Sequence, residues 1–248
     1  MPLSPWPYPF WIAHRGAGKL APENTLAAFR LGASHGYRAF ECDVKLSRDG
    51  VPFLLHDTTL DRTTPAVGVA GERDWAELSL LDAGGWHSPG YAGEPLPSLE
   101  GVACFVRSNG YSLNIELKPT PGRELDTGRA VGEACLRLWH DEPQLPLFSS
   151  FRPEALLGAR DTAPAIPRAL LVDETWPGWM PMAQSLGCVA VVTNHKLMDE
   201  TLRATLHRAG LRALCYTVNE ASDVERLQRL GIDGIITDAV DRFEADSA

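Results

Sequence analysis

The chain has 248 residues, of which 44% are hydrophobic, and a formal net charge of -9 at pH 7. This length and hydrophobic content are sufficient for one large core, and we expect a single domain over residues 1–248. Nucleic acid and anionic lipid repel an acidic protein at long range, so we expect no nucleic-acid partner and no stable membrane association.

The start of the chain, residues 1–11, is rich in proline and has no basic stretch leading into an apolar run, so it does not resemble a secretion signal. No apolar run reaches the roughly 20 residues of a membrane helix. The five cysteines show no C-x-x-C pairing and indicate neither a disulfide framework nor a zinc site. We interpret them as buried apolar residues in a reducing compartment, which predicts a cytoplasmic location.

Short β-rich apolar runs alternate with helix-like stretches along the whole chain, a pattern typical of βαβ units. The eight strand candidates are residues 10–14, 39–46, 112–118, 145–151, 168–173, 188–194, 211–218 and 233–240. The helix candidates between them include residues 23–36, 127–140, 199–210 and 221–231. Eight parallel strands in a chain of this length predict a (β/α)8 TIM barrel rather than an open doubly wound sheet.

One stretch interrupts this alternation. Residues 58–97 are rich in Gly, Pro and Thr and contain only a short helix-like piece at residues 75–81. We interpret them as a small inserted segment after the second βα region, on one rim of the barrel. Long loops in a compact domain are usually binding walls or lids.

Two strand candidates carry ionisable residues where a parallel barrel should be apolar. Glu41 and Asp43 are two residues apart, so the strand period of two places them on one face, and Glu116 and Lys118 repeat that spacing. Three carboxylates offer only oxygen ligands, which favours a hard divalent cation, Mg²⁺ or Ca²⁺. The alternative is a buried ion-pair cluster with Lys118 and Arg15 that only shapes the core.

Histidines lie at the ends of two extended runs. His14 and Arg15 follow the first strand, and His56 follows residues 51–55. The C-terminal ends of barrel strands form the catalytic rim, and two histidines there suit acid–base chemistry because their pKa lies near neutrality. Arg15 and Lys118 would supply the positive charge that a phosphate needs.

Six segments together resemble the glycerophosphodiester phosphodiesterase family almost from end to end. They are AHRGAGKLAPENTLAAF, ECDVKLSRDG, FLLHD, NIELKP, YTVN and DGIITD. Their combination at these spacings is specific, unlike a single short motif. The chain is most similar to the cytosolic bacterial type that accompanies the glycerol 3-phosphate ABC uptake system.

The resemblance implies metal-dependent hydrolysis of small-molecule glycerophosphodiesters to sn-glycerol 3-phosphate and an alcohol. In this family the substrate's own 2-hydroxyl attacks phosphorus, and water then opens a cyclic phosphate. The implied residues are Glu41, Asp43 and Glu116 for the metal, His14 and His56 for acid–base catalysis, and Arg15 and Lys118 for the phosphate.

Phe151 and Tyr216 lie near strand ends, where they would form an apolar wall around the glycerol or belong to the ordinary core. Many family members carry Trp where this chain has Tyr216, which leaves the preferred alcohol open. Two other functions stay open as well: a phospholipase D-like metal-dependent barrel that acts on lysophospholipids, and a barrel that binds phosphodiesters without turnover. A homodimer is also left open.

Overall fold

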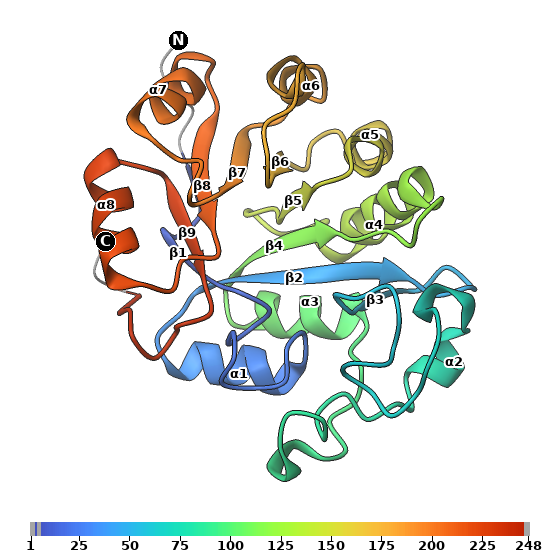
Figure 1. Cartoon of the computed structure of the whole chain (residues 1–248). Helices are drawn as coiled ribbons and strands as arrows, with labels where there is room; N and C mark the ends of the chain where they lie inside the picture. Colours follow the sequence, from blue (N-terminus) through green and yellow to red (C-terminus); the bar gives the residue numbers. More distant parts are fainter. Residues whose placement is uncertain (1–2, 4–5, 246–248) are drawn as a thin grey trace.

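The structure, a computed structural model, describes residue 3 and residues 6–245. In this part of the chain, the strands that pair in parallel are β1 (Trp11–Ala13), β2 (Ala39–Leu46), β4 (Ser112–Leu117), β5 (Leu147–Ser150), β6 (Arg168–Val172), β7 (Ala190–Asn194), β8 (Arg212–Tyr216) and β9 (Gly234–Thr237). The sheet closes because β1 pairs with β9 on one side and with β2 on the other. The predicted (β/α)8 barrel is therefore confirmed (Figure 1).

Helices surround the barrel (Figure 1). They are α1 (Leu26–Ser34), α3 (Leu99–Ser108), α4 (Glu124–Leu138), α5 (Pro153–Thr162), α6 (Trp179–Ser185), α7 (Glu200–Arg208) and α8 (Ala221–Leu230). Thr25 caps the start of α1, where its side chain accepts a hydrogen bond from the Ala28 backbone, and Gly231 caps the end of α8 with a φ of 68°, a left-handed conformation that glycine allows. Within the described residues, none of the helices has both the length and the apolar character needed to span a bilayer.

The strands bury both faces, and the alternation of side chains separates two layers. Trp11 and Ile235 point outward into the core between barrel and helices, whereas Ile12 and Ile236 point into the barrel. Buried carboxylates take the place of these apolar side chains further along β2 and β4. The cysteines follow the expected burial except Cys104, which is exposed on α3.

The predicted inserted segment, residues 58–97, follows the second barrel strand and precedes α3. It begins after β3 (Pro52–Leu54), which pairs antiparallel with β2, and it contains the short helix α2 (Trp75–Leu78) and two 3-10 turns, η1 (Ala70–Glu72) and η2 (Pro89–Tyr91). The segment has a small apolar core that includes Leu60, Leu78 and Leu96 and packs on Phe53. It lies at one side of the barrel mouth (Figure 1).

The proline-rich start, residues 1–11, lies partly outside the described residues.

Candidate active site

Three carboxylates meet inside the barrel because of strand register. Asp43 of β2 pairs directly with Glu116 of β4, and Glu41 precedes Asp43 by two residues on the same face. All three are buried, and one oxygen of each lies within 4.8 Å of the others. The second oxygen of Glu41, Oε1, is buried and has no hydrogen-bond partner among the described residues. An orphaned buried carboxylate oxygen in an all-oxygen cluster fits a bound hard cation.

The electrostatics of this cluster favour the same conclusion. Burial, together with the negative charges of Asp43 and Glu116, raises the pKa of Glu41 well above its usual value. Burial also raises the pKa of Glu116 to about 7. Burial opposes ionisation of Asp43, but Arg15 and Lys118 hold its pKa below the usual range. The two cations therefore do not neutralise three carboxylates, and a divalent cation would allow all three to ionise.

Both cations stand beside the carboxylates. Lys118 Nζ lies 2.9 Å from Glu116 Oε1 and 3.4 Å from Asp43 Oδ1. Arg15 Nη1 donates to Glu23 Oε1 at 2.9 Å, and Arg15 Nε lies 3.3 Å from Asp43 Oδ2 without hydrogen-bond geometry. This placement presents positive charge at the rim, where an anionic phosphate would contact it.

The backbone at Arg15 and Asn24 is strained, and its conformation places hydrogen-bond donors beside two of the carboxylates. Arg15 and Asn24 have φ of 51° and 58°, in the left-handed region that costs a residue with a side chain about 1–2 kcal/mol. The Arg15 backbone N–H donates to Glu41 Oε2 at 3.0 Å, while the Asn24 amide donates to Asp43 Oδ2 at 2.8 Å. Asp43 N donates to Asn24 Oδ1, and Asn24 N donates to Arg15 O. These bonds offset the strain and fix two of the three carboxylates.

His14 is oriented by the last strand. Ala13 pairs with Thr237, so the next residues, His14 and Asp238, lie side by side, and His14 Nδ1 is 2.6 Å from Asp238 Oδ1. Asn219 Nδ2 donates to the other oxygen of Asp238 at 3.0 Å. His14 Nε2 then faces the site, 3.8 Å from Glu41 Oε2.

His56 has the same arrangement on the opposite side of the carboxylates. Its Nδ1 is 2.7 Å from Asp57 Oδ1, and Arg62 of the 58–97 segment binds both oxygens of Asp57. The hydrogen bonds from Arg62 lower the pKa of Asp57 to about 2, and burial lowers the pKa of His56.

The carboxylates set the proton position on both rings. Burial opposes ionisation of Asp238, but its hydrogen bond to His14 lowers its pKa, and Asp57 has a lowered pKa as well. Both carboxylates are therefore ionised near neutrality and can only accept, so each Nδ1 carries a proton. In the neutral ring, Nε2 is then a free base directed at the site.

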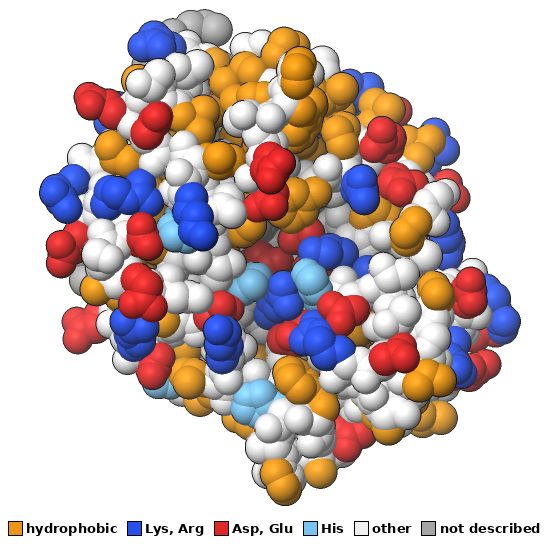
Figure 2. All heavy atoms as spheres, in the orientation of Figure 1, with side chains coloured by type: hydrophobic (Ala, Val, Ile, Leu, Met, Phe, Trp, Pro, Cys, Tyr) orange, Lys and Arg blue, Asp and Glu red, His pale blue; other side chains and the backbone are white. Residues whose placement is uncertain are grey.

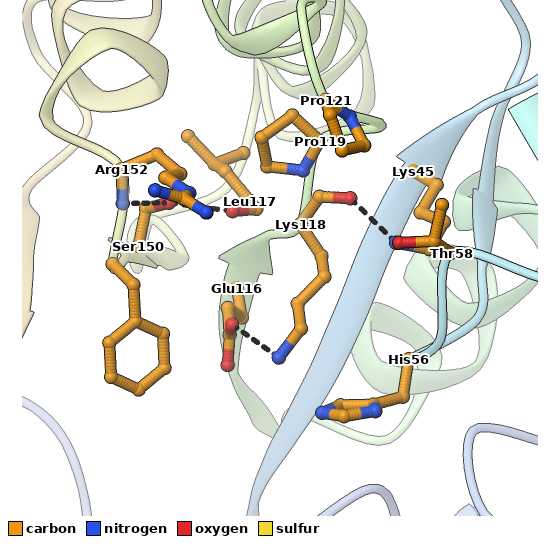
Figure 3. Close-up of a pocket in the computed structure, with 11 residues that line it drawn as sticks. Lys45, His56, Thr58, Glu116, Leu117, Lys118, Pro119, Pro121, Ser150 and Arg152 are labelled. Atoms are coloured by element: carbon orange, nitrogen blue, oxygen red, sulfur yellow. Dashed lines mark hydrogen bonds and ion pairs between the residues drawn. The ribbon is translucent and has the colours of Figure 1, made fainter. Parts of the chain in front are cut away.

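A cavity of about 300 Å³ opens beside the carboxylates, with His56, Glu116 and Lys118 in its wall (Figure 3). Basic, acidic and histidine side chains gather in a central hollow of the surface (Figure 2). Phe151 lines the cavity, and its ring meets Tyr216 edge-on with centroids 5.6 Å apart. The structure thus brings all nine predicted site residues to the same end of the barrel.

Sequence reasoning did not assign functional positions to Asp57, Asp238, Asn24 and Lys45. Asp57 directly follows His56, and barrel closure would have paired Asp238 with His14. Lys45 is two residues beyond Asp43, so strand alternation places it in the same row. It is 1% exposed, and its Nζ donates to the Lys118 carbonyl at 3.0 Å. Burial lowers its pKa to about 8.

The chain matches one protein family and several known proteins over most of its length. Residues 14–242 match the model of the family described as "Glycerophosphoryl diester phosphodiesterase family". A glycerophosphodiester phosphodiesterase of Caldanaerobacter subterraneus subsp. tengcongensis is 32% identical over 235 residues, which cover 92% of this chain and 93% of that protein.

Solved structures are similar over the same extent. A phosphodiesterase of Oleispira antarctica, in complex with the product sn-glycerol-3-phosphate, superposes with a TM-score of 0.86 at 34% identity and 93% coverage of both chains. A glycerophosphodiester phosphodiesterase of Agrobacterium tumefaciens gives a TM-score of 0.77 at 26% identity, covering 95% of this chain and 98% of that one.

Proposed function

The chain belongs to the glycerophosphoryl diester phosphodiesterase family, and on that premise we propose that it hydrolyses glycerophosphodiesters to sn-glycerol 3-phosphate and an alcohol in a metal-dependent reaction. One observation carries the proposal. Two histidines, each oriented by a carboxylate through Nδ1, flank a cluster of three buried carboxylates and two cations. Acid–base groups on both sides of an anion site suit the transfer of a phosphoryl group between two oxygens.

Glu41, Asp43 and Glu116 would hold the divalent cation, Mg²⁺ or Ca²⁺. When bound, the cation supplies positive charge that stabilises the phosphoryl oxygens as charge develops on them. Arg15 and Lys118 bind the same phosphate, Arg15 through its planar fork and Lys118 as a point charge.

In the first step, His14 Nε2 accepts the proton of the glycerol 2-hydroxyl, whose oxygen attacks phosphorus. The bond from phosphorus to the leaving alcohol breaks, and His56, which enters this step protonated on both ring nitrogens, donates its Nε2 proton to that oxygen. In the second step, His56 accepts a proton from water, whose oxygen attacks the cyclic phosphate. The bond from phosphorus to the 2-oxygen breaks, and His14 returns its proton to that oxygen. One diester and one water thus yield glycerol 3-phosphate and one alcohol. Each proton transfer contributes about 10²–10⁴-fold to the rate.

We also propose that the chain is one domain in which residues 58–97 are an inserted rim segment. The support is its small separate core and its polar link to the site, in which Arg62 donates to both Glu23 and Asp57. The segment would act on catalysis by fixing Asp57, and through it the ring of His56.

Product analysis on glycerophosphocholine tests the proposed reaction. Choline and glycerol 3-phosphate are expected, whereas phosphocholine and glycerol would mean that the other phosphoester bond breaks. Lysophosphatidylcholine is the comparison substrate, because faster turnover of the lipid would favour a phospholipase D-like activity. Binding of both compounds without any product would favour a barrel that only binds phosphodiesters.

A further inference from the structure

The cavity beside the carboxylates is asymmetric in its charge. Its wall includes His56 but not His14, and the cationic side chains of Lys45, Lys118 and Arg152 (Figure 3). Among the described residues that line it, Glu116 is the one acidic side chain. Because β4 lies between β2 and β5 in the sheet, Lys45 and Arg152 reach the cavity from opposite sides.

Two of these cations form no ion pair with a carboxylate in the described part of the chain. Lys118 is paired with Glu116 at 2.9 Å and with Asp43 at 3.4 Å. Lys45 Nζ instead donates to a neutral acceptor, the Lys118 carbonyl, although the side chain is buried. Within the described part of the chain, the guanidinium of exposed Arg152 has neither a hydrogen bond nor an ion pair. A ligand in this cavity therefore meets two cationic side chains that no described carboxylate pairs directly.

We propose that this cavity receives the leaving alcohol and favours an alcohol that carries a negative charge, in the form of a carboxylate or a further phosphate. Lys45 and Arg152 would be its specificity-determining residues. The inference rests on the proposed function, because His56, the proton donor to the leaving oxygen, is the histidine in this wall. The exposed guanidinium of Arg152 can donate charge-assisted hydrogen bonds to an anion, which are the stronger kind, and the buried Lys45 adds positive charge to the same wall.

The wall of this cavity offers a quaternary ammonium group no set of aromatic faces among the described residues. Such cations are bound by several aromatic faces together. Of the aromatic residues described, Phe151 alone lines the cavity, apart from the imidazole of His56. The Phe151 ring already has Lys118 Nζ at 5.7 Å from its centroid and the edge of Tyr216 against it. The remaining wall, which includes Leu117, Pro119 and Pro121, offers apolar contact to carbon atoms of any alcohol.

A matched pair of substrates isolates the effect, since glycerophosphoserine differs from glycerophosphoethanolamine by one carboxylate. The measurement is the ratio of their kcat/KM values, with glycerol 3-phosphate release as readout in Mg²⁺ or Ca²⁺. We expect wild type to favour the serine compound about tenfold, the effect of one hydrogen bond to a charged group. A second pair, glycerophosphoglycerol with and without a terminal phosphate, tests whether a phosphate on the leaving alcohol also raises kcat/KM.

Lys45→Met and Arg152→Gln should each lower both ratios about three- to tenfold. Lys45→Met retains the apolar stem in its buried position, and Arg152→Gln changes an exposed side chain, so at least the second variant is expected to fold normally. The matched control is Arg137→Gln, which removes the same charge near the C-terminal end of α4, away from the cavity wall, and should leave both ratios unchanged.

The outcomes separate this inference from the function on which it rests. Absence of glycerol 3-phosphate from all four substrates would contradict the proposed function itself. Turnover with wild-type ratios near one, or with ratios that neither variant lowers more than Arg137→Gln does, would overturn the assignment of the cavity and leave the function intact. A response to the carboxylate pair alone, or to the phosphate pair alone, would support the assignment and identify which anion it serves.

Discussion

Replacing Asp238 with asparagine tests whether the orientation of His14, rather than its presence alone, controls turnover. Asp238 accepts from His14 Nδ1 at 2.6 Å and from Asn219 Nδ2 at 3.0 Å. The side-chain amide of Asn219 cannot flip to exchange its oxygen and nitrogen. Its oxygen already accepts hydrogen bonds from Asp238 N at 2.9 Å and from Thr237 Oγ1 at 3.2 Å. An asparagine at position 238 can therefore keep both hydrogen bonds in one orientation only. Its amide oxygen must accept from Asn219 Nδ2, and its amide nitrogen must donate to His14 Nδ1.

That arrangement moves the His14 proton to Nε2, the nitrogen that must accept a proton from the substrate. We expect kcat to fall about 10³-fold, which corresponds to about 4 kcal/mol in the activation barrier. The folded state keeps its hydrogen bonds, so the free energy of unfolding should fall by only about 1 kcal/mol. The assay is steady-state release of glycerol 3-phosphate, with thermal unfolding followed by circular dichroism.

Asp233→Asn is the matched control, since it removes a histidine–aspartate contact at the other end of the same strand. Asp233 Oδ2 lies 2.7 Å from His207 Nε2, and Arg212 Nη1 is 2.6 Å from Asp233 Oδ1. This variant should lose stability while keeping kcat within about twofold of wild type, because the contact lies far from the rim. The reasoning is refuted if Asp238→Asn retains a third of wild-type kcat, or if the control loses as much activity.

Three further predictions follow from the site. His14→Ala and His56→Ala should each reduce turnover at least about 100-fold with an unchanged circular dichroism spectrum, and near wild-type activity would remove that residue from the mechanism. Glu116→Gln should raise the Mg²⁺ or Ca²⁺ concentration that gives half-maximal activity about tenfold, because one charged ligand is lost; an identical metal titration would contradict the ligand assignment. Asp57, whose pKa is about 2 in the folded protein, should add about 1 kcal/mol to the free energy of unfolding above about pH 4, after allowance for its partial exposure. Since the pKa of Asp57 is lower in the folded than in the unfolded protein, this contribution is lost as the pH falls toward 2. Asp57→Asn should therefore make the free energy of unfolding in urea depend less on pH in this range. Parallel pH profiles of wild type and variant would exclude the effect.

Strand alternation was enough to place the acidic row. The period of two puts Glu41 and Asp43 on one face and Glu116 on the matching face of a second strand, and the structure has all three there. Counting apolar runs was enough to predict the barrel, because its strands are buried along most or all of their length. The catalytic and metal-binding roles of these residues stay predictions, as do the cytoplasmic location and the homodimer.

The partners of the histidines depend on information that a local pattern does not contain. His14 and Asp238 meet only because the first and last strands pair, with Ala13 opposite Thr237. The Asp57 contact with Arg62 depends on the path of a loop without a repeating pattern. Lys45 is different, since the same alternation that identified Asp43 also places it in the acidic row.

We propose that the three carboxylates and the two oriented histidines form the active site of a metal-dependent phosphodiesterase. The most direct test of this proposal is glycerol 3-phosphate release from glycerophosphocholine and glycerophosphoserine by chelator-treated protein, before and after Mg²⁺ or Ca²⁺ is restored. We expect little release of glycerol 3-phosphate in chelator and recovery when the ion is restored. Equal rates in chelator and in metal would contradict the metal site, and silence from folded, metal-loaded protein on both substrates would contradict the proposed activity.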